Sequence, residues 1–292
     1  MIFINEETEF IADGQDAAVD EMDQLILEEG ITLGDDFSAE EMGAVEICLE
    51  METSWAALVQ DMGAIEHKSI VNEDAGILTE GLKSWWTAII NFFKRVWAAI
   101  SSWFKKAWDW ITRRFQNAEK WYKANVKKIT ATSTKYSTYP FVANKDDVTP
   151  KQNKLINMIK NAKTREEVSK LGITRKILMT DMLGATERKE MTVTKAAVEY
   201  HILGGNAWLA ALKGAHNVQA AALKGGISFA QQGLRTADDK AAAGLKEKVE
   251  ATKAKLTALK LLDAQTLRAY NFGISDAFAV AKKLLRESKA AA

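Results

Sequence analysis

The sequence predicts an all-α protein with an acidic helical N-terminal segment, a long Trp-rich amphipathic helix and a C-terminal helical bundle. Only two prolines, Pro140 and Pro150, occur in 292 residues, while Ala, Leu, Lys and Glu are abundant. This mix favours long helices, because proline is the main helix breaker. In several stretches the apolar residues recur in steps of three and four, which is the spacing of one face of a helix.

The net charge of zero conceals two opposite parts of the chain. Residues 1–80 contain 22 Asp and Glu and one basic residue, Lys68, whereas residues 81–292 contain 17 Asp and Glu against 38 Lys and Arg. The charge changes sign within a few residues of Glu80. Such an asymmetry is typical of an acidic pro-region or docking segment attached to a body that binds a polyanion or a membrane. The alternative is a protein whose acidic and basic faces pack together.

Residues 1–80 are predicted to form amphipathic helices with acidic outer faces. One helix is expected over 16–29. A second is expected over 38–62, with Ser38 as N-cap and Glu41 at the reciprocal position of a capping box. Helices this short are only marginally stable in isolation. We therefore expect them to dock on a basic surface. The same segment is placed to mask the aromatic face of the helix that follows.

Residues 81–127 are predicted to form one basic amphipathic helix about 65 Å long. It holds seven of the nine tryptophans, and its candidate membrane or partner face includes Trp86, Phe93, Trp97, Trp103, Phe104 and Trp110. Its candidate polyanion-binding residues are Lys94, Arg95, Lys105, Lys106, Arg113 and Arg114. An aromatic face of this size must be covered by the rest of the protein, another copy of the chain or a bilayer interface. We expect packing in the resting protein, with membrane contact only after release.

Residues 128–150 are predicted to be a linker or a short extended element, because they are rich in Thr, Ser and Tyr and contain both prolines. Residues 151–292 are predicted to form a helical domain, in which Thr164 caps a helix. The Gly-Gly pairs at 204–205 and 225–226 are expected to break or bend helices. The helices are expected at 151–162, 164–171, 174–184, 192–203, 207–234, 238–270 and 272–288.

The sequence contains no signature of an enzyme, a metal site or a cofactor site. Walker A, G-x-G-x-x-G, H-E-x-x-H and G-x-S-x-G motifs are all missing. The single cysteine, Cys48, excludes an internal disulfide, and His67, His201 and His216 show no nucleophile–base pattern. We expect no conventional transmembrane helix, because no run of about 18 uncharged apolar residues occurs. The first residues also lack the pattern of a secretory signal.

Candidate cleavage sites follow glutamates in the acidic part of the chain. Glu80 ends a Leu-Thr-Glu sequence followed by Gly81, at the change of charge, and Glu66 ends an Ala-Ile-Glu sequence. Over residues 1 to about 125 this layout resembles the internal head proteins of large tailed bacteriophages. In that group an acidic helical pro-region directs a basic protein into the assembling head. A prohead protease then cleaves after a glutamate in a Leu/Ile-x-Glu or small-x-Glu context.

The resemblance implies a non-enzymatic virion protein that lies inside the capsid and loses its pro-region near Glu80. Its implied partners are capsid or scaffold proteins and the prohead protease, and the basic body would contact packaged DNA or be ejected with it. Two other classes stay open on the residues alone. One is a membrane-active pore-former or toxin with an inhibitory pro-segment. The other is a cytoplasmic helical scaffold, and a homo-oligomer fits any of the three classes.

Overall fold

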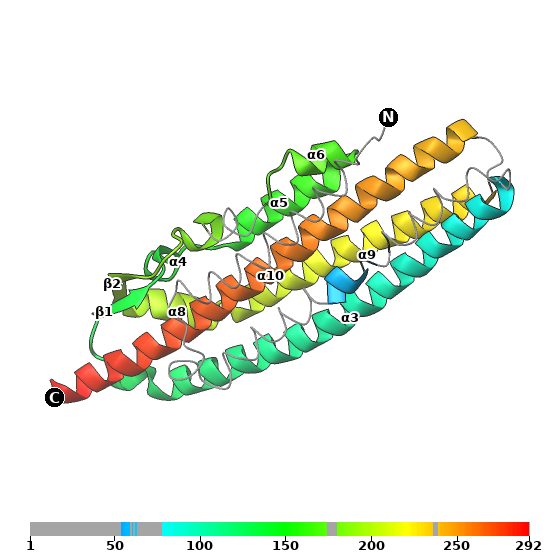
Figure 1. The fold of residues 1–292 in the computed structure, drawn as a ribbon. Coiled ribbons are helices and arrows are strands. Elements are labelled where there is room, and N and C mark those ends of the chain that lie inside the picture. Colours follow the sequence, from blue (N-terminus) through cyan, green and yellow to red (C-terminus); the bar gives the residue numbers. More distant parts are fainter. Residues whose placement is uncertain are drawn as a thin grey trace.

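Three long helices form an elongated bundle in the computed structural model (Figure 1). They are α3 (Leu78–Asn125), α9 (Gly205–Arg235) and α10 (Asp239–Ala290). Helix α9 runs antiparallel to α3, since the start of one helix contacts the end of the other. The structure describes residues 54–58, 60, 62, 78–173, 180–235 and 239–291. The predicted helix at 16–29, most of that at 38–62, and Glu66 lie outside these residues.

Shorter elements pack beside α10. In chain order they are η1 (Val126–Lys128), β1 (Ser133–Thr138), α4 (Pro140–Ala143), α5 (Thr149–Asn161), α6 (Arg165–Ser169), β2 (Lys189–Thr194) and α8 (Lys195–Leu203). Of these, β1, β2, α4 and α8 lie toward the end of the bundle that holds the C-terminus, and α5 and α6 extend from there along α10 to its middle (Figure 1). We call the end with the C-terminus the proximal half, and the end where α9 and α10 follow one another the distal half.

The mostly helical prediction is confirmed, and the structure adds one small two-stranded antiparallel sheet formed by β1 and β2. Ser133 lies opposite Thr194 and Thr138 opposite Lys189. Strand β1 falls in the region predicted as a linker or short extended element. Strand β2 replaces the start of the helix predicted at 192–203, where Thr-Val-Thr is β-branched and favours a strand.

The long predicted helices are confirmed at 81–127 and 207–234, as α3 and α9. The Thr164 cap is also confirmed, since its hydroxyl accepts a hydrogen bond from the Glu167 backbone N–H at 3.2 Å at the start of α6. The helices predicted at 238–270 and 272–288 are instead one continuous helix, α10. A Cβ on Gly273 would lie 2.9 Å from Phe141 and Trp208, so this glycine serves packing and not a break.

The Gly-Gly pair at 225–226 was expected to break or bend a helix, but α9 runs through it. The reason is close contact with α3, whose large aromatic side chains pack directly onto glycines of α9. An added Cβ would come too near these rings for any residue but glycine. The aromatic–glycine pairs, with the distance from that Cβ to the nearest ring atom, are Trp86–Gly233 (2.2 Å), Phe93–Gly226 (2.7 Å) and Phe115–Gly205 (2.8 Å). The pair at 204–205, in contrast, separates α8 from α9 as expected.

The buried apolar side chains form two clusters along the bundle. The proximal cluster joins α3, α9 and α10 to the shorter elements. The distal cluster comprises Leu58, Met62, Trp85, Trp86, Ile89, Phe92, Phe93, Val96, Ile100, Leu223, Ala230, Leu245, Val249 and Leu256. Within the described part of the chain, its members therefore come from α3, α9, α10 and the stretch that holds Leu58 and Met62.

The aromatic–glycine contacts predict opposite effects of two Gly→Ala substitutions within α9. Gly233→Ala should destabilise the protein by about 1–3 kcal/mol, because the new methyl group collides with Trp86. Gly214→Ala is the matched control, since a Cβ there meets nothing within 4 Å, and it should stabilise the protein by about 0.5–1 kcal/mol. Urea unfolding followed by circular dichroism measures both. Equal effects at the two positions would contradict the packing described here.

Candidate functional site: the docking position of residues 54–62 and the basic surface of α3

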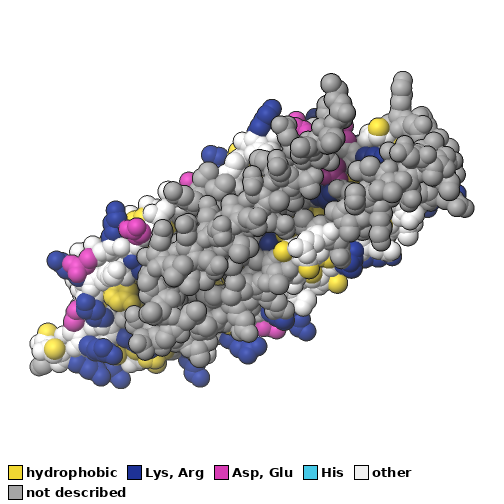
Figure 2. Space-filling view, viewed as in Figure 1, with side chains coloured by type: hydrophobic (Ala, Val, Ile, Leu, Met, Phe, Trp, Pro, Cys, Tyr) yellow, Lys and Arg dark blue, Asp and Glu magenta, His cyan; other side chains and the backbone are white. Residues whose placement is uncertain are grey.

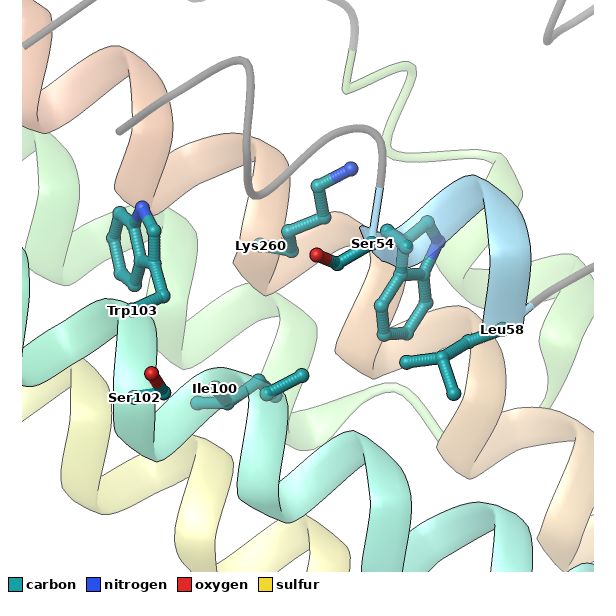
Figure 3. A pocket seen from close by; sticks show the side chains of 8 residues that line it. Ser54, Leu58, Ile100, Ser102, Trp103 and Lys260 are labelled. Carbon is teal, nitrogen blue, oxygen red and sulfur yellow. The ribbon is translucent and has the colours of Figure 1, made fainter. Parts of the chain in front are cut away.

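A short stretch of the acidic N-terminal region lies against the middle of the bundle. Ser54–Leu58 are helical, as are Gln60 and Met62. Figure 3 shows Leu58 beside Ile100 of α3, with Lys260 of α10 across the same pocket. The pocket is lined by Ser54, Trp55, Leu58, Ala99, Ile100, Ser102, Trp103 and Lys260. The acidic region therefore contacts the basic body through apolar side chains at the junction of α3 and α10.

Two of these side chains are part of the distal core. Leu58 is 9% exposed and Met62 is 2% exposed. Burying each stabilises the folded chain by roughly 1.5–3 kcal/mol as an upper estimate. Trp55 is half-buried, and the Lys260 ammonium lies 5.6 Å from the centroid of its ring. A cation over an indole face is attractive, so Trp55 anchors the segment to α10.

The predicted membrane or partner face of α3 divides into three groups. Trp86, Phe93 and Trp103 are buried in the bundle, at 0%, 0% and 6% exposed. Trp97 is 38% exposed, and it stacks with the imidazole of His216 at a ring-centroid distance of 5.5 Å. Phe104 is half-buried and stacks with the same imidazole at 3.9 Å. Trp110, also half-buried, packs against the proximal cluster. Most of this face is thus covered by the protein itself.

Five of the six predicted polyanion-binding residues are exposed, namely Lys94, Arg95, Lys105, Lys106 and Arg113. In Figure 2, Lys and Arg side chains line the edge of the molecule along which α3 runs in Figure 1. Arg114 differs, because it is half-buried and its guanidinium donates a hydrogen bond to Ser275 Oγ at 2.5 Å. Its guanidinium carbon also lies 5.5 Å from the centroid of the Trp110 ring. Arg114 therefore joins α3 to α10.

The predicted cleavage position lies at the start of α3. The Glu80–Gly81 bond is in the first turn of the helix, which begins at Leu78. The first four backbone N–H groups of a helix have no partner within it, and such ends fray readily. A protease that binds extended backbone would need to unwind this single turn.

Buried polar groups lie where the two core clusters meet. Gln219 Nε2 donates a hydrogen bond to Asp263 Oδ2 at 2.5 Å, and burial raises the pKa of the Asp263 carboxyl well above its usual range. The nearby Gln265 amide is buried without a hydrogen-bond partner among the described residues. We describe these groups as a polar layer between α9 and α10.

His201 is a structural histidine within the proximal core. It is fully buried, its Nε2–H donates to the Val142 carbonyl at 3.1 Å, and burial lowers its pKa to about 4. Across the described ranges, no group of three or more His, Cys, Asp or Glu side chains could hold a metal ion. Nor does that part of the chain contain a helix long and apolar enough to cross a membrane.

Sequence reasoning identified the cations of α3 but missed Lys260, the contact of Trp55. Lys260 lies within the helix predicted at 238–270, for which no contact with the acidic region was expected. The apolar spacing of Trp55, Leu58 and Met62 was the available signal that this part of the acidic segment docks. Comparisons of the chain with protein-family models, curated proteins and solved structures gave no match.

Proposed function

We propose that this chain is a non-enzymatic protein of the bacteriophage capsid interior, made as a precursor with an acidic N-terminal region that is removed near Glu80. The observation that supports this most directly is the apolar docking of Leu58 and Met62 on a body whose helix α3 exposes Lys94, Arg95, Lys105, Lys106 and Arg113. The acidic region is thereby held close to the cations that would bind a polyanion.

A masking role follows from the charges. A free body with 38 bases against 17 acids would bind nucleic acid without sequence preference, through release of counterions from phosphates. An attached segment with 22 acids opposes that attraction until it is removed. Removal of the acidic segment within the capsid would then allow the basic body to bind packaged DNA, or to be ejected with the DNA.

The membrane-active alternative is less well supported. Trp86, Phe93 and Trp103 are covered by α9 and α10, so insertion into a bilayer would require α3 to leave the bundle. A scaffold role would need a separate basic partner for the acidic region, whereas the described part of that region already docks on its own chain. Polyanion binding requires neither the departure of α3 from the bundle nor a separate basic partner.

The exposed cations of α3 predict the strength and salt dependence of DNA binding. In the body of residues 81–292, Lys94→Gln, Lys105→Gln and Arg113→Gln together should weaken binding to duplex DNA. The slope of log affinity against log salt should fall by about three, roughly one for each lost phosphate contact. Fluorescence anisotropy over a salt series measures both quantities.

The matched control is Lys154→Gln, Lys163→Gln and Lys170→Gln, three exposed lysines in and around α5 and α6. This control should change the slope much less, although it removes the same charge. Equal losses in the two triple variants would show that binding depends on net charge and not on α3. The full-length chain should bind more weakly than the body.

Cleavage after Glu80 predicts a defined N-terminus of the natural protein, and it predicts that substitution of Glu80 blocks the cleavage. Protein isolated from its natural source should begin at Gly81, and Glu80→Gln should retain residues 1–80. N-terminal sequencing and intact mass measure the outcome. Glu66→Gln is the control, because loss of that glutamate should leave the Gly81 terminus unchanged. Natural protein that begins at Met1 would contradict the precursor proposal.

A further inference from the structure

We propose that the distal half of the bundle is a binding site for an amphipathic helix, filled here by residues 54–62, and that it opens separately from the proximal half when they detach. The occupant is this chain's own segment, seated through Leu58 and Met62. The inference goes beyond the proposed function, because it holds whether or not the chain is cleaved at Glu80.

The two halves differ in what supports them. The proximal cluster is surrounded by η1, β1, β2 and four short helices in addition to the three long ones. Among the residues that the structure describes, the distal cluster draws only on the three long helices and on Leu58 and Met62. Loss of the segment therefore removes one of the four described components of the distal core and no member of the proximal cluster.

The polar layer weakens the connection between the halves. Gln219 occupies the buried face of α9 between Ala215 of the proximal cluster and Leu223 of the distal cluster. It pairs with Asp263, and both residues keep one buried oxygen without a hydrogen-bond partner among the described residues. Buried polar groups left partly unsatisfied contribute less to stability than apolar packing. On α9 this pair marks the change from the proximal to the distal cluster, whereas on α10 the distal cluster ends at Leu256, before Leu259 and Leu262 of the proximal cluster and before Asp263.

The distal part of α9 also depends on its neighbours for helical structure. It contains Gly225, Gly226 and Gly233, and glycine is a poor helix former because it loses the most backbone entropy. Its helix persists because Phe93 and Trp86 cover Gly226 and Gly233. If the distal cluster loosens, this part of α9 has little intrinsic tendency to stay folded.

Amide hydrogen exchange of the full chain carrying Leu58→Glu tests the proposal, because a buried carboxylate at this position should expel the segment. We expect exchange to accelerate about ten-fold or more in 85–100, 222–234 and 245–256. Exchange in 103–122 and 259–288 should change little. The matched control is Gln60→Glu, which places the same charge on an exposed position of the segment and should leave both halves protected.

A second variant, Leu58→Ala, removes the apolar contact without adding charge and should produce the same pattern at smaller amplitude. Acceleration of both halves together, in Leu58→Glu and Leu58→Ala alike, would overturn the proposal, since the bundle would then open as one unit. Unchanged exchange in both variants would overturn it as well. In that case the segment would rest on a bundle that is complete without it.

Discussion

The structure depends on the contact between the aromatic side chains of α3 and the glycines of α9. Because Gly226 and Gly233 carry no Cβ, the backbone of α9 reaches the rings of Phe93 and Trp86. This contact fixes which face of α3 points inward, and so it places the cations Lys94 and Lys105 on the outside. A helix whose sequence is typical of a bilayer interface is thereby accommodated in a protein core.

Covering the aromatic face in this way changes the part that the acidic region plays. Trp103 lines the pocket beside Trp55 and Leu58, whereas Trp86 packs against Gly233 of α9 and needs no cover from the acidic region. Its described residues instead supply Leu58 and Met62 to the distal core and place Trp55 over Lys260. Apolar contacts position the segment. Its carboxylates then lower the positive electrostatic potential around the body over about a Debye length.

Local patterns in the sequence predicted the features that depend on local physics. Helix α3 followed from its apolar spacing, and the Thr164 cap from the spacing of Thr164 and Glu167. The exposure of Lys94 and Lys105 followed from the same helical period. These predictions needed no knowledge of distant residues.

The features that the sequence did not predict depend on contacts between distant parts of the chain. Strand β1 exists because Ser133 pairs with Thr194, and neither strand has a partner nearby in sequence. Gly226 was expected to interrupt a helix, but its contact with the Phe93 ring overrides the local preference of glycine. Arg114 was grouped with the exposed cations, although its hydrogen bond to Ser275 joins positions 161 residues apart.

We propose that apolar docking, and not charge alone, holds the acidic region on the body. The direct measurement inserts a site for a sequence-specific protease after Asn72, cuts the folded full-length chain there, and follows both pieces by size-exclusion chromatography in 1 M NaCl. At that salt concentration the Debye length is about 3 Å, so exposed charges are largely screened. We expect the pieces to elute together, and we expect Leu58→Glu to separate them. Separation of the unmodified pieces in 1 M NaCl would contradict it.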